Sequence, residues 1–280
     1  MRDGQIRIGV VAPATRITPS IEREVTELAQ GLHPGRVSLK FHPQCFLSSG
    51  HFAGDDAARL SAFLEFANDE SLDAIWFARG GYGSNRIAQR AAEGLSPAAR
   101  KKIYLGYSDL GFLLAALYKA GCRSVHGPMC ADLNRVGGEA AAARALRYLV
   151  EGAPETLEPQ ARGGEPVAAF NITVLSHLLG TPLEPDLSRH VLMLEEVSEQ
   201  HYRIDRALFH ISESPAIRRV AGIRLGRCSL IPPNDPPFLQ EEEEIARYWC
   251  ARSGIAFLGR ADIGHDVDNK IVPFGKNPIT

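Results

Sequence analysis

Short apolar runs typical of buried strands alternate with longer runs of helical periodicity along the first half of this 280-residue chain. Alternation of this kind predicts a mostly parallel sheet with helices on both faces, because parallel strands need a crossover between them. The expected strands span residues 6–11, 37–41, 72–78, 103–107 and 123–126, and the expected helices span 20–31, 55–68, 109–120 and 140–149.

Proline, glycine and glutamate accumulate between residues 151 and 168, which indicates a linker. Beyond it we expect strands at 191–194 and 217–225 and helices at 202–212 and 239–253. The sequence therefore predicts an α/β protein in three parts: a Rossmann or flavodoxin-like parallel-sheet domain at 1–150, a linker at 151–168, and a smaller α/β domain at 169–280. The acidic run 241–244 is interpreted as a solvated helix start, where the helix dipole favours negative charge, and not as a metal site.

Charge and composition exclude several classes of function. A net charge of −2, from 31 basic and 33 acidic residues, gives no overall basic field for nucleic acid or an anionic membrane. No run approaches the roughly 18 apolar residues of a membrane span. The first residues lead into a strand without a secretory h-region, which predicts a cytoplasmic location. The cysteines, odd in number and scattered, favour buried free thiols over a disulfide framework or a zinc cage; they are Cys45, Cys122, Cys130, Cys228 and Cys250.

Ser108 stands between an expected strand and an expected helix. On such a turn its hydroxyl would project from the sheet edge beside the first free amides of the helix, which can hold an oxyanion. The G-x-S-x-G pattern of a nucleophile elbow is not met, since Leu110 takes the place of the second glycine. The local sequence leaves two interpretations open, a nucleophile and a helix N-cap.

Two further places could carry chemistry. The glycines within Gly80–Gly83 follow a strand end and would let backbone amides approach a ligand, although a plain tight turn explains them equally well. Glu195 closes a strand in the second half, and His265 lies near the chain end. With Ser108 they give the order nucleophile, acid, histidine, but triads are recognised by geometry and many chains offer this order by chance.

Short segments of the chain occur together in the order seen in a known peptidase family. They are IGVVAPA at 8–14, ARGGYG at 78–83, GYSD at 106–109, HGPM at 126–129, LGTP at 179–182, LEEV at 194–197, YRIDR at 202–206, GH at 264–265 with Asn269, and PFG at 273–275. Taken together, they resemble the LD-carboxypeptidases of serine peptidase family S66. That family includes murein tetrapeptide carboxypeptidases and microcin C immunity peptidases.

The resemblance implies a role for each matching residue. Ser108 corresponds to the nucleophile, Glu195 to the triad acid and His265 to the general base, with the backbone amides of Asp109 and of a glycine in Gly80–Gly81 as the oxyanion hole. The site would lie between the two domains, without a metal or an organic cofactor.

An exopeptidase must also bind the free carboxylate of its substrate, and some positions depart from the family. Arg79, Tyr82 and Arg203 are the substrate-binding candidates, while His126 is interpreted as more structural than catalytic. Phe170 stands where the family often has glycine and could reshape the cleft, Glu196 stands where aspartate is common, and the chain stops soon after residue 275. These departures concern the substrate and leave the triad intact.

The resemblance predicts a cytoplasmic serine carboxypeptidase that removes terminal D-alanine from murein tetrapeptides during peptidoglycan recycling. One alternative is a peptidase acting on microcin C-type peptidyl-nucleotides, whose relatives carry a loop with a base-stacking aromatic. Between residues 131 and 170 the aromatic residues of this chain are Tyr148 and Phe170 alone. Its two tryptophans, Trp76 and Trp249, lie outside that stretch. A catalytically inactive peptide-binding relative is the other alternative. The expected partner is a muropeptide or a related small peptide, with homodimers as the expected assembly.

Overall fold

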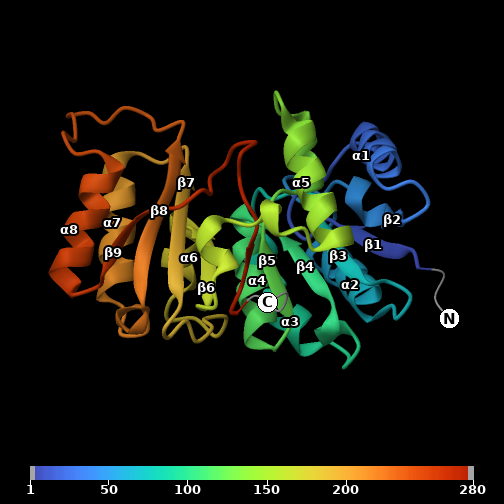
Figure 1. Ribbon diagram of the computed structural model, residues 1–280, viewed down its shortest axis with the longest axis horizontal. Coiled ribbons are helices and arrows are strands. Elements are labelled where there is room, and N and C mark those ends of the chain that lie inside the picture. The colour runs from blue at the N-terminus through green and yellow to red at the C-terminus, as the bar shows by residue number, and fades with distance from the viewer. Residues whose placement is uncertain (1–3, 277–280) are drawn as a thin grey trace.

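The computed structural model describes residues 4–276 and contains two β-sheets side by side (Figure 1). In the first sheet the strand order is β10-β5-β4-β3-β1-β2, and all neighbours are parallel except β10. The strands are β1 (Ile6–Val11), β2 (Val37–Phe41), β3 (Ala74–Phe77), β4 (Ile103–Gly106), β5 (Arg123–His126) and β10 (Val272–Pro273). The first five follow the 2-1-3-4-5 order of flavodoxin-like folds, so the predicted fold class is confirmed.

Helices cover both faces of this sheet, as its apolar strands require. Side chains of α1 (Pro19–Leu32) and α5 (Gly138–Glu151) pack into one hydrophobic cluster, and those of α2 (Asp56–Asn68), α3 (Ala88–Glu93) and α4 (Gly111–Lys119) pack into the other. The second cluster continues into the C-terminal half of the chain, so the two halves share a core.

The second sheet is entirely parallel, with the order β6-β7-β8-β9. Its strands are β6 (Val167–Asn171), β7 (Val191–Val197), β8 (Gly222–Ser229) and β9 (Phe257–Arg260). On one face it packs against α6 (Ile172–Leu178), α7 (His201–Glu213) and α8 (Glu242–Ser253). The other face packs against Ala161, Ile263 and Val272, which belong to segments without long helices.

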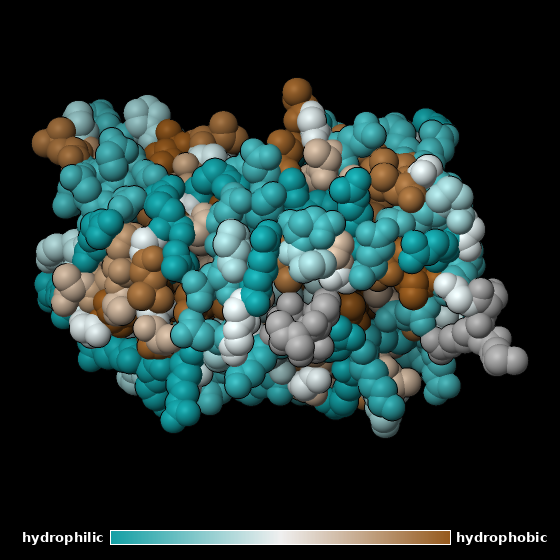
Figure 2. All heavy atoms as spheres, viewed as in Figure 1, coloured by the Kyte–Doolittle hydropathy of each residue, from teal (hydrophilic) through white to brown (hydrophobic). Residues whose placement is uncertain are grey.

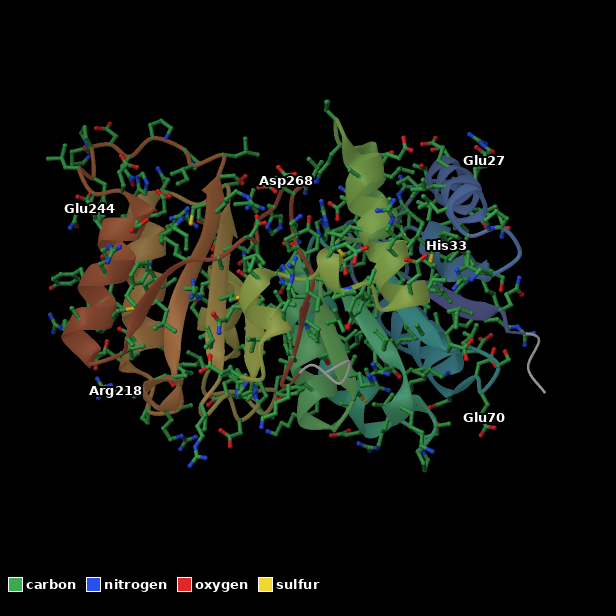
Figure 3. All side chains as sticks on the ribbon, viewed as in Figure 1. Glu27, His33, Glu70, Arg218, Glu244 and Asp268 are labelled. Carbon is green, nitrogen blue, oxygen red and sulfur yellow. The ribbon has the colours of Figure 1, made fainter. Side chains whose placement is uncertain are left out.

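The C-terminal segment, red in Figure 1, crosses back from the second half to the first, where β10 pairs with β5. Asp268 on this segment lies between the two halves (Figure 3). Residues 151–168 contain two 3-10 turns with buried Leu157 and Ala161, and β6 already begins at Val167. Segments 151–168 and 261–273 therefore join the two halves by packing as well as by chain connection.

Several expectations from local sequence differ from the structure. The strand expected at 217–225 begins at Gly222, because Ile217–Arg219 forms a 3-10 turn. Helix α3 and strands β6, β9 and β10 were not predicted; they are short, and tertiary packing decides whether such segments form. All five cysteines are free and four are buried. No helix within residues 4–276 has both the length and the apolar character to cross a membrane. The face in Figure 2 is mostly hydrophilic.

Candidate active site

Ser108 lies at the carboxyl end of β4 with a backbone φ of +62°, in the left-handed region that L-residues rarely adopt. A 3-10 turn over Ser108–Leu110 then leads into α4. The neighbouring β3 ends beside this elbow. A Cβ added to Gly80 would lie 3.0 Å from the Ser108 Cβ, so only glycine fits this close approach. The strained turn is the geometry expected of a nucleophile elbow.

The hydroxyl of Ser108 lies 2.9 Å from Nε2 of His265, and Nδ1 of His265 lies 2.5 Å from Oε2 of Glu195. Glu195 is fully buried in β7 and His265 follows β9, so three distant segments meet. The carboxylate holds the proton on Nδ1, which leaves Nε2 free to accept the proton of Ser108. The structure thus brings together the three residues predicted to form a triad.

The environment of His265 contains opposing influences on its basicity. Burial is the largest and lowers the pKa, but the negative charge of Glu195 and its hydrogen bond outweigh burial. The net effect raises the pKa of His265 above its usual value of 6.5. An imidazole made more basic in this way is a stronger proton acceptor for a serine hydroxyl.

We expect kcat/KM to rise with pH through the raised pKa of His265, because a general base must be neutral to accept a proton. The contribution of His265 to folding stability runs the opposite way. It is complete below pH 6.5, the ordinary pKa, and is lost as pH rises through the folded-state pKa. In Glu195→Gln the acid limb of the pH profile should move to lower pH, because burial then dominates. Steady-state pH profiles of kcat/KM for both proteins check this. An unshifted acid limb would show that Glu195 does not set the pKa of the titrating group.

The loop that carries His265 is held from the first half of the chain. Arg135 donates to the backbone carbonyl of His265, and Arg144 donates to the carbonyl oxygens of Val267 at 2.7 Å and Asn269 at 3.0 Å. Charge-assisted hydrogen bonds of this kind are stronger than neutral ones. Local sequence gave no signal for either arginine, since their acceptors are more than a hundred residues away.

Two backbone amides lie where an oxyanion hole would be expected. Within residues 4–276, the N–H groups of Gly81 and Asp109 donate to no protein acceptor. The Asp109 carboxylate accepts from the N–H of Gly83 at 3.2 Å and of Ser84 at 2.9 Å, which ties the glycine turn to the serine elbow. Burial raises the pKa of Asp109, although these hydrogen bonds oppose the rise. Both free amides therefore have fixed positions beside Ser108.

Thr15, which follows β1, fixes the direction of one of these amides. Its hydroxyl donates to the carbonyl oxygen of Gly80 at 2.5 Å, and its N–H donates to the same oxygen at 3.3 Å. In a trans peptide the carbonyl and the next N–H point in opposite directions. Holding the Gly80 carbonyl therefore aims the Gly81 N–H away from Thr15. Sequence reasoning missed Thr15.

Thr15→Val is expected to lower kcat about 10-fold with little change in KM, less than the ~100- to 1,000-fold cost of losing an oxyanion donor outright. The loss arises because the Gly80–Gly81 peptide is then held by one hydrogen bond instead of two. Thr15→Ser keeps the hydroxyl and should recover most of the activity. Equal kcat values for the valine variant and the parent protein would show that this hydrogen bond does not direct the amide.

A cavity of about 450 Å³ opens at Ser108 between the two halves. Its lining residues are Gly81, Tyr82, Asn85, Ser108, Asp109, Phe112, Asn171, Thr173, Val174, His177, Glu196, Val197 and Glu199. Of the three substrate-binding candidates Tyr82 lines this cavity, whereas Arg79 and Arg203 do not. Asn85, His177 and Glu199 were missed by sequence reasoning.

Neighbours of the triad have mainly structural contacts. Glu196 is buried and accepts hydrogen bonds from Asn171, from the N–H and hydroxyl of Thr173, and from the N–H of Val197. Burial raises the pKa of Glu196, and these hydrogen bonds oppose the rise. The Glu196 carboxylate therefore anchors the start of α6 and is directed away from His265.

Two other sequence candidates are also buried. Phe170 packs on Phe274 with ring centroids 5.0 Å apart and does not line the cavity. The expectation that it reshapes the cleft is wrong, because this position of β6 faces the core. His126 is buried, with Nε2 3.2 Å from Oδ1 of Asn269, and burial lowers its pKa to about 4. A neutral buried imidazole favours the structural interpretation.

The acidic run at 241–244 opens α8, with Glu241 as N-cap in a capping box with Glu244. His201, Glu241 and Glu242 offer ligand atoms within 4.8 Å of one another. None of the three lines the cavity at Ser108.

The site has a strained serine elbow, and an imidazole lies between that serine and a buried carboxylate. Two free backbone amides stand beside the serine at the strand ends of an α/β fold. Together these features define a serine-type hydrolase. Sequence comparison matches the LD-carboxypeptidase N-terminal domain to residues 8–127 and the LD-carboxypeptidase C-terminal domain to residues 166–278. The chain is a serine-type peptidase and belongs to the LD-carboxypeptidase family, peptidase family S66.

Relatives of the chain include named carboxypeptidases. The murein tetrapeptide carboxypeptidase of Pseudomonas aeruginosa is 26% identical over 98% of this chain and 92% of its own length. A protein named probable murein peptide carboxypeptidase, from Bacillus subtilis, is 30% identical over 96% of this chain and 86% of its own length.

Solved structures share the fold. The muramoyltetrapeptide carboxypeptidase from Oxalobacter formigenes superposes with a TM-score of 0.77 at 20% identity, covering 96% of this chain and 92% of the other. The microcin C7 self immunity protein MccF, in complex with glutamyl sulfamoyl guanosine, superposes with a TM-score of 0.77 at 17% identity, covering 98% and 92%.

Proposed function

We propose that this protein hydrolyses the L,D-amide bond of murein tetrapeptides and releases the terminal D-alanine, in peptidoglycan recycling in the cytoplasm. The observation that carries the proposal is the hydrogen-bonded chain from Ser108 through His265 to Glu195, opening on a cavity of peptide size. The names of the Pseudomonas and Bacillus relatives support a murein peptide as substrate. Homodimer formation stays a prediction.

In the proposed mechanism Nε2 of His265 takes the proton of Ser108 while Oγ attacks the carbonyl carbon of the penultimate residue. The oxyanion of the tetrahedral intermediate accepts hydrogen bonds from the N–H groups of Gly81 and Asp109. His265 then gives its proton to the amine of the departing D-alanine. Water, deprotonated by the same imidazole, releases the acyl group from Ser108. Glu195 stabilises the imidazolium in both steps.

Recognition of the terminal carboxylate is assigned to the cavity. Because neither Arg79 nor Arg203 lines it, we assign the carboxylate to donors that do: the hydroxyl of Tyr82 and the amide of Asn85. A neutral His177 is not a donor here, because its Nδ1–H donates to the carbonyl oxygen of Thr173 and its Nε2 is then an acceptor. Within residues 4–276 the buried Oδ1 of Asn85 has no hydrogen-bond partner, so the protein does not fix this amide and its N–H₂ group can turn toward a ligand. Neutral donors suffice for a carboxylate when several converge on it.

The test compares a free tetrapeptide that contains meso-diaminopimelate with the matched pentapeptide and with the tetrapeptide amide. Mass spectrometry should show loss of one D-alanine from the tetrapeptide alone, with or without EDTA. Equal cleavage of all three peptides would mean that the protein is a broader amidase and not a carboxypeptidase. Loss of activity in EDTA that zinc restores would overturn the serine mechanism.

Two controls address the alternatives. A peptidyl-sulfamoyl nucleoside cleaved faster than the tetrapeptide would favour the microcin-type function; the cavity lining contains Tyr82 and Phe112 but no tryptophan. Covalent labelling of Ser108 by a serine-reactive phosphonate would exclude an inactive binding protein.

A further inference from the structure

A groove of about 440 Å³ adjoins the catalytic cavity between α6 and α7. Its lining residues are Thr173, Ser176, His177, Leu179, Glu199, Arg203, Arg206, Ala207 and His210. Three residues line both the groove and the cavity: Thr173, His177 and Glu199. Ser108 lines the cavity but not the groove. The groove is therefore continuous with the cavity but farther from the nucleophile.

The groove is rich in basic groups and contains one acid. Arg203, Arg206 and His210 are spaced by three and four residues along α7, so they lie on the same face of the helix. The guanidinium carbons of Arg203 and Arg206 lie 5.8 and 5.5 Å from the ring centroid of Tyr202, which limits their freedom. The acid is Glu199, whose Oε2 lies 3.5 Å from Nη1 of Arg203. Two guanidinium groups beside one carboxylate leave an excess of positive charge for an anionic ligand.

Covalent geometry separates the two carboxylates that belong to the residues on either side of the scissile bond of a murein peptide. The terminal carboxylate carbon is three bonds from the attacked carbonyl carbon, about 4 Å, and belongs in the cavity with Ser108. A carboxylate at the far end of a diaminopimelate side chain is six bonds from that carbon, about 7–8 Å when extended. The groove, which Ser108 does not line, fits the more distant group.

We propose that this groove binds the α-amino acid headgroup at the end of the side chain of the penultimate residue. Arg203 and Arg206 pair with its carboxylate, and Glu199 accepts from its ammonium group. The assignment rests on the proposed murein peptidase function and adds to it a specificity: diaminopimelate is preferred over lysine, which has the ammonium group without the carboxylate. A lysine substrate would leave the guanidinium groups without their anion.

The experiment uses three tetrapeptides that differ only in the third residue: meso-diaminopimelate, its side-chain carboxamide, and L-lysine. The parent protein should prefer the first over the other two by about 10- to 100-fold in kcat/KM, the usual value of a charge-assisted hydrogen bond. Arg203→Gln combined with Arg206→Gln should bring that ratio close to one by slowing only the diaminopimelate substrate. Glu199→Gln should slow the diaminopimelate and lysine peptides alike, because both carry the ammonium group.

Arg247→Gln on α8 is the matched control. Arg247 is also exposed, also pairs with an acid one turn away, Glu243 at 2.7 Å, and also lies over an aromatic ring, Phe257. It lines neither the groove nor the cavity, so its substitution should keep the substrate ratio. Phosphonate labelling of Ser108 in each variant shows that the triad is still assembled.

Each contrary outcome has its own meaning. If the parent protein cleaves the three tetrapeptides with equal kcat/KM, the groove assignment is overturned, but the proposed murein peptidase function is not. If the Arg203/Arg206 variant instead loses discrimination between the tetrapeptide and its terminal amide, the groove holds the terminal carboxylate and the inference is wrong. If the parent protein cleaves none of the tetrapeptides, the proposed function fails, and this inference fails with it.

Discussion

Ser108→Ala is expected to reduce kcat by about 10⁴- to 10⁶-fold, the usual cost of losing a triad nucleophile. The hydroxyl that His265 activates at 2.9 Å is removed, and no neighbouring group replaces it as a nucleophile. The fold should be retained, because alanine keeps the Cβ and no other hydrogen bond of the Ser108 side chain is lost. Initial rates on the tetrapeptide, together with thermal unfolding, measure both effects.

Ser71→Ala is the matched control, since Ser71 is an exposed serine whose hydroxyl bonds Asp69 at the far end of α2. It should leave kcat unchanged. Retention of more than about a tenth of the activity by Ser108→Ala would exclude Ser108 as the nucleophile, given the usual size of this effect.

His265→Ala is expected to lower kcat about as much as the serine variant, and Glu195→Gln somewhat less, near 10⁴-fold. His265 moves the proton, whereas Glu195 orients the imidazole and stabilises its charge. A glutamine at 195 can turn its N–H₂ group toward Nδ1, which would favour the wrong tautomer of the histidine. Single-turnover kinetics on the tetrapeptide would rank the two variants.

Glu196→Gln is the control for that comparison, because it makes the same chemical change one residue along β7. The Glu196 carboxylate accepts hydrogen bonds from Asn171, Thr173 and Val197, and none from His265. We expect a fall in the unfolding temperature and a much smaller fall in kcat than for Glu195→Gln. The reverse order would mean that Glu196 is the residue acting on the histidine.

The serine elbow is a case in which local sequence came close to the answer. Strand, turn and helix around Ser108 were predicted, but the missing second glycine kept an N-cap interpretation open. The structure explains the exception. Leu110 is fully buried in the core, and the close contact falls instead on Gly80, in the loop after β3, where an added Cβ would lie 3.0 Å from the Ser108 Cβ. Glycine is needed where the chain passes this close, and here that place is in the loop that follows the neighbouring strand.

The residues that line the cavity or support its wall were less predictable. Thr15, Asn85 and His177 stand in segments with no motif of their own, and Arg79 stands inside one yet does not line the cavity. One general rule could have found Thr15: the carboxyl ends of β1, β3 and β4 meet at one edge of a parallel sheet. No such rule predicts His177 as a cavity residue, because its position depends on how α6 packs against the N-terminal half of the chain.

The sequence by itself determined the parallel α/β architecture, because apolar runs such as Ala74–Phe77 can be buried only with cover on both faces of a sheet. It also determined which segments resemble the family and, through them, the triad candidates. Only the tertiary structure decided that β10, two residues long, joins the first sheet, and that Arg135 and Arg144 hold the loop that carries His265. The reason is physical: these contacts join residues more than a hundred positions apart in the chain, and no local pattern encodes such a pairing.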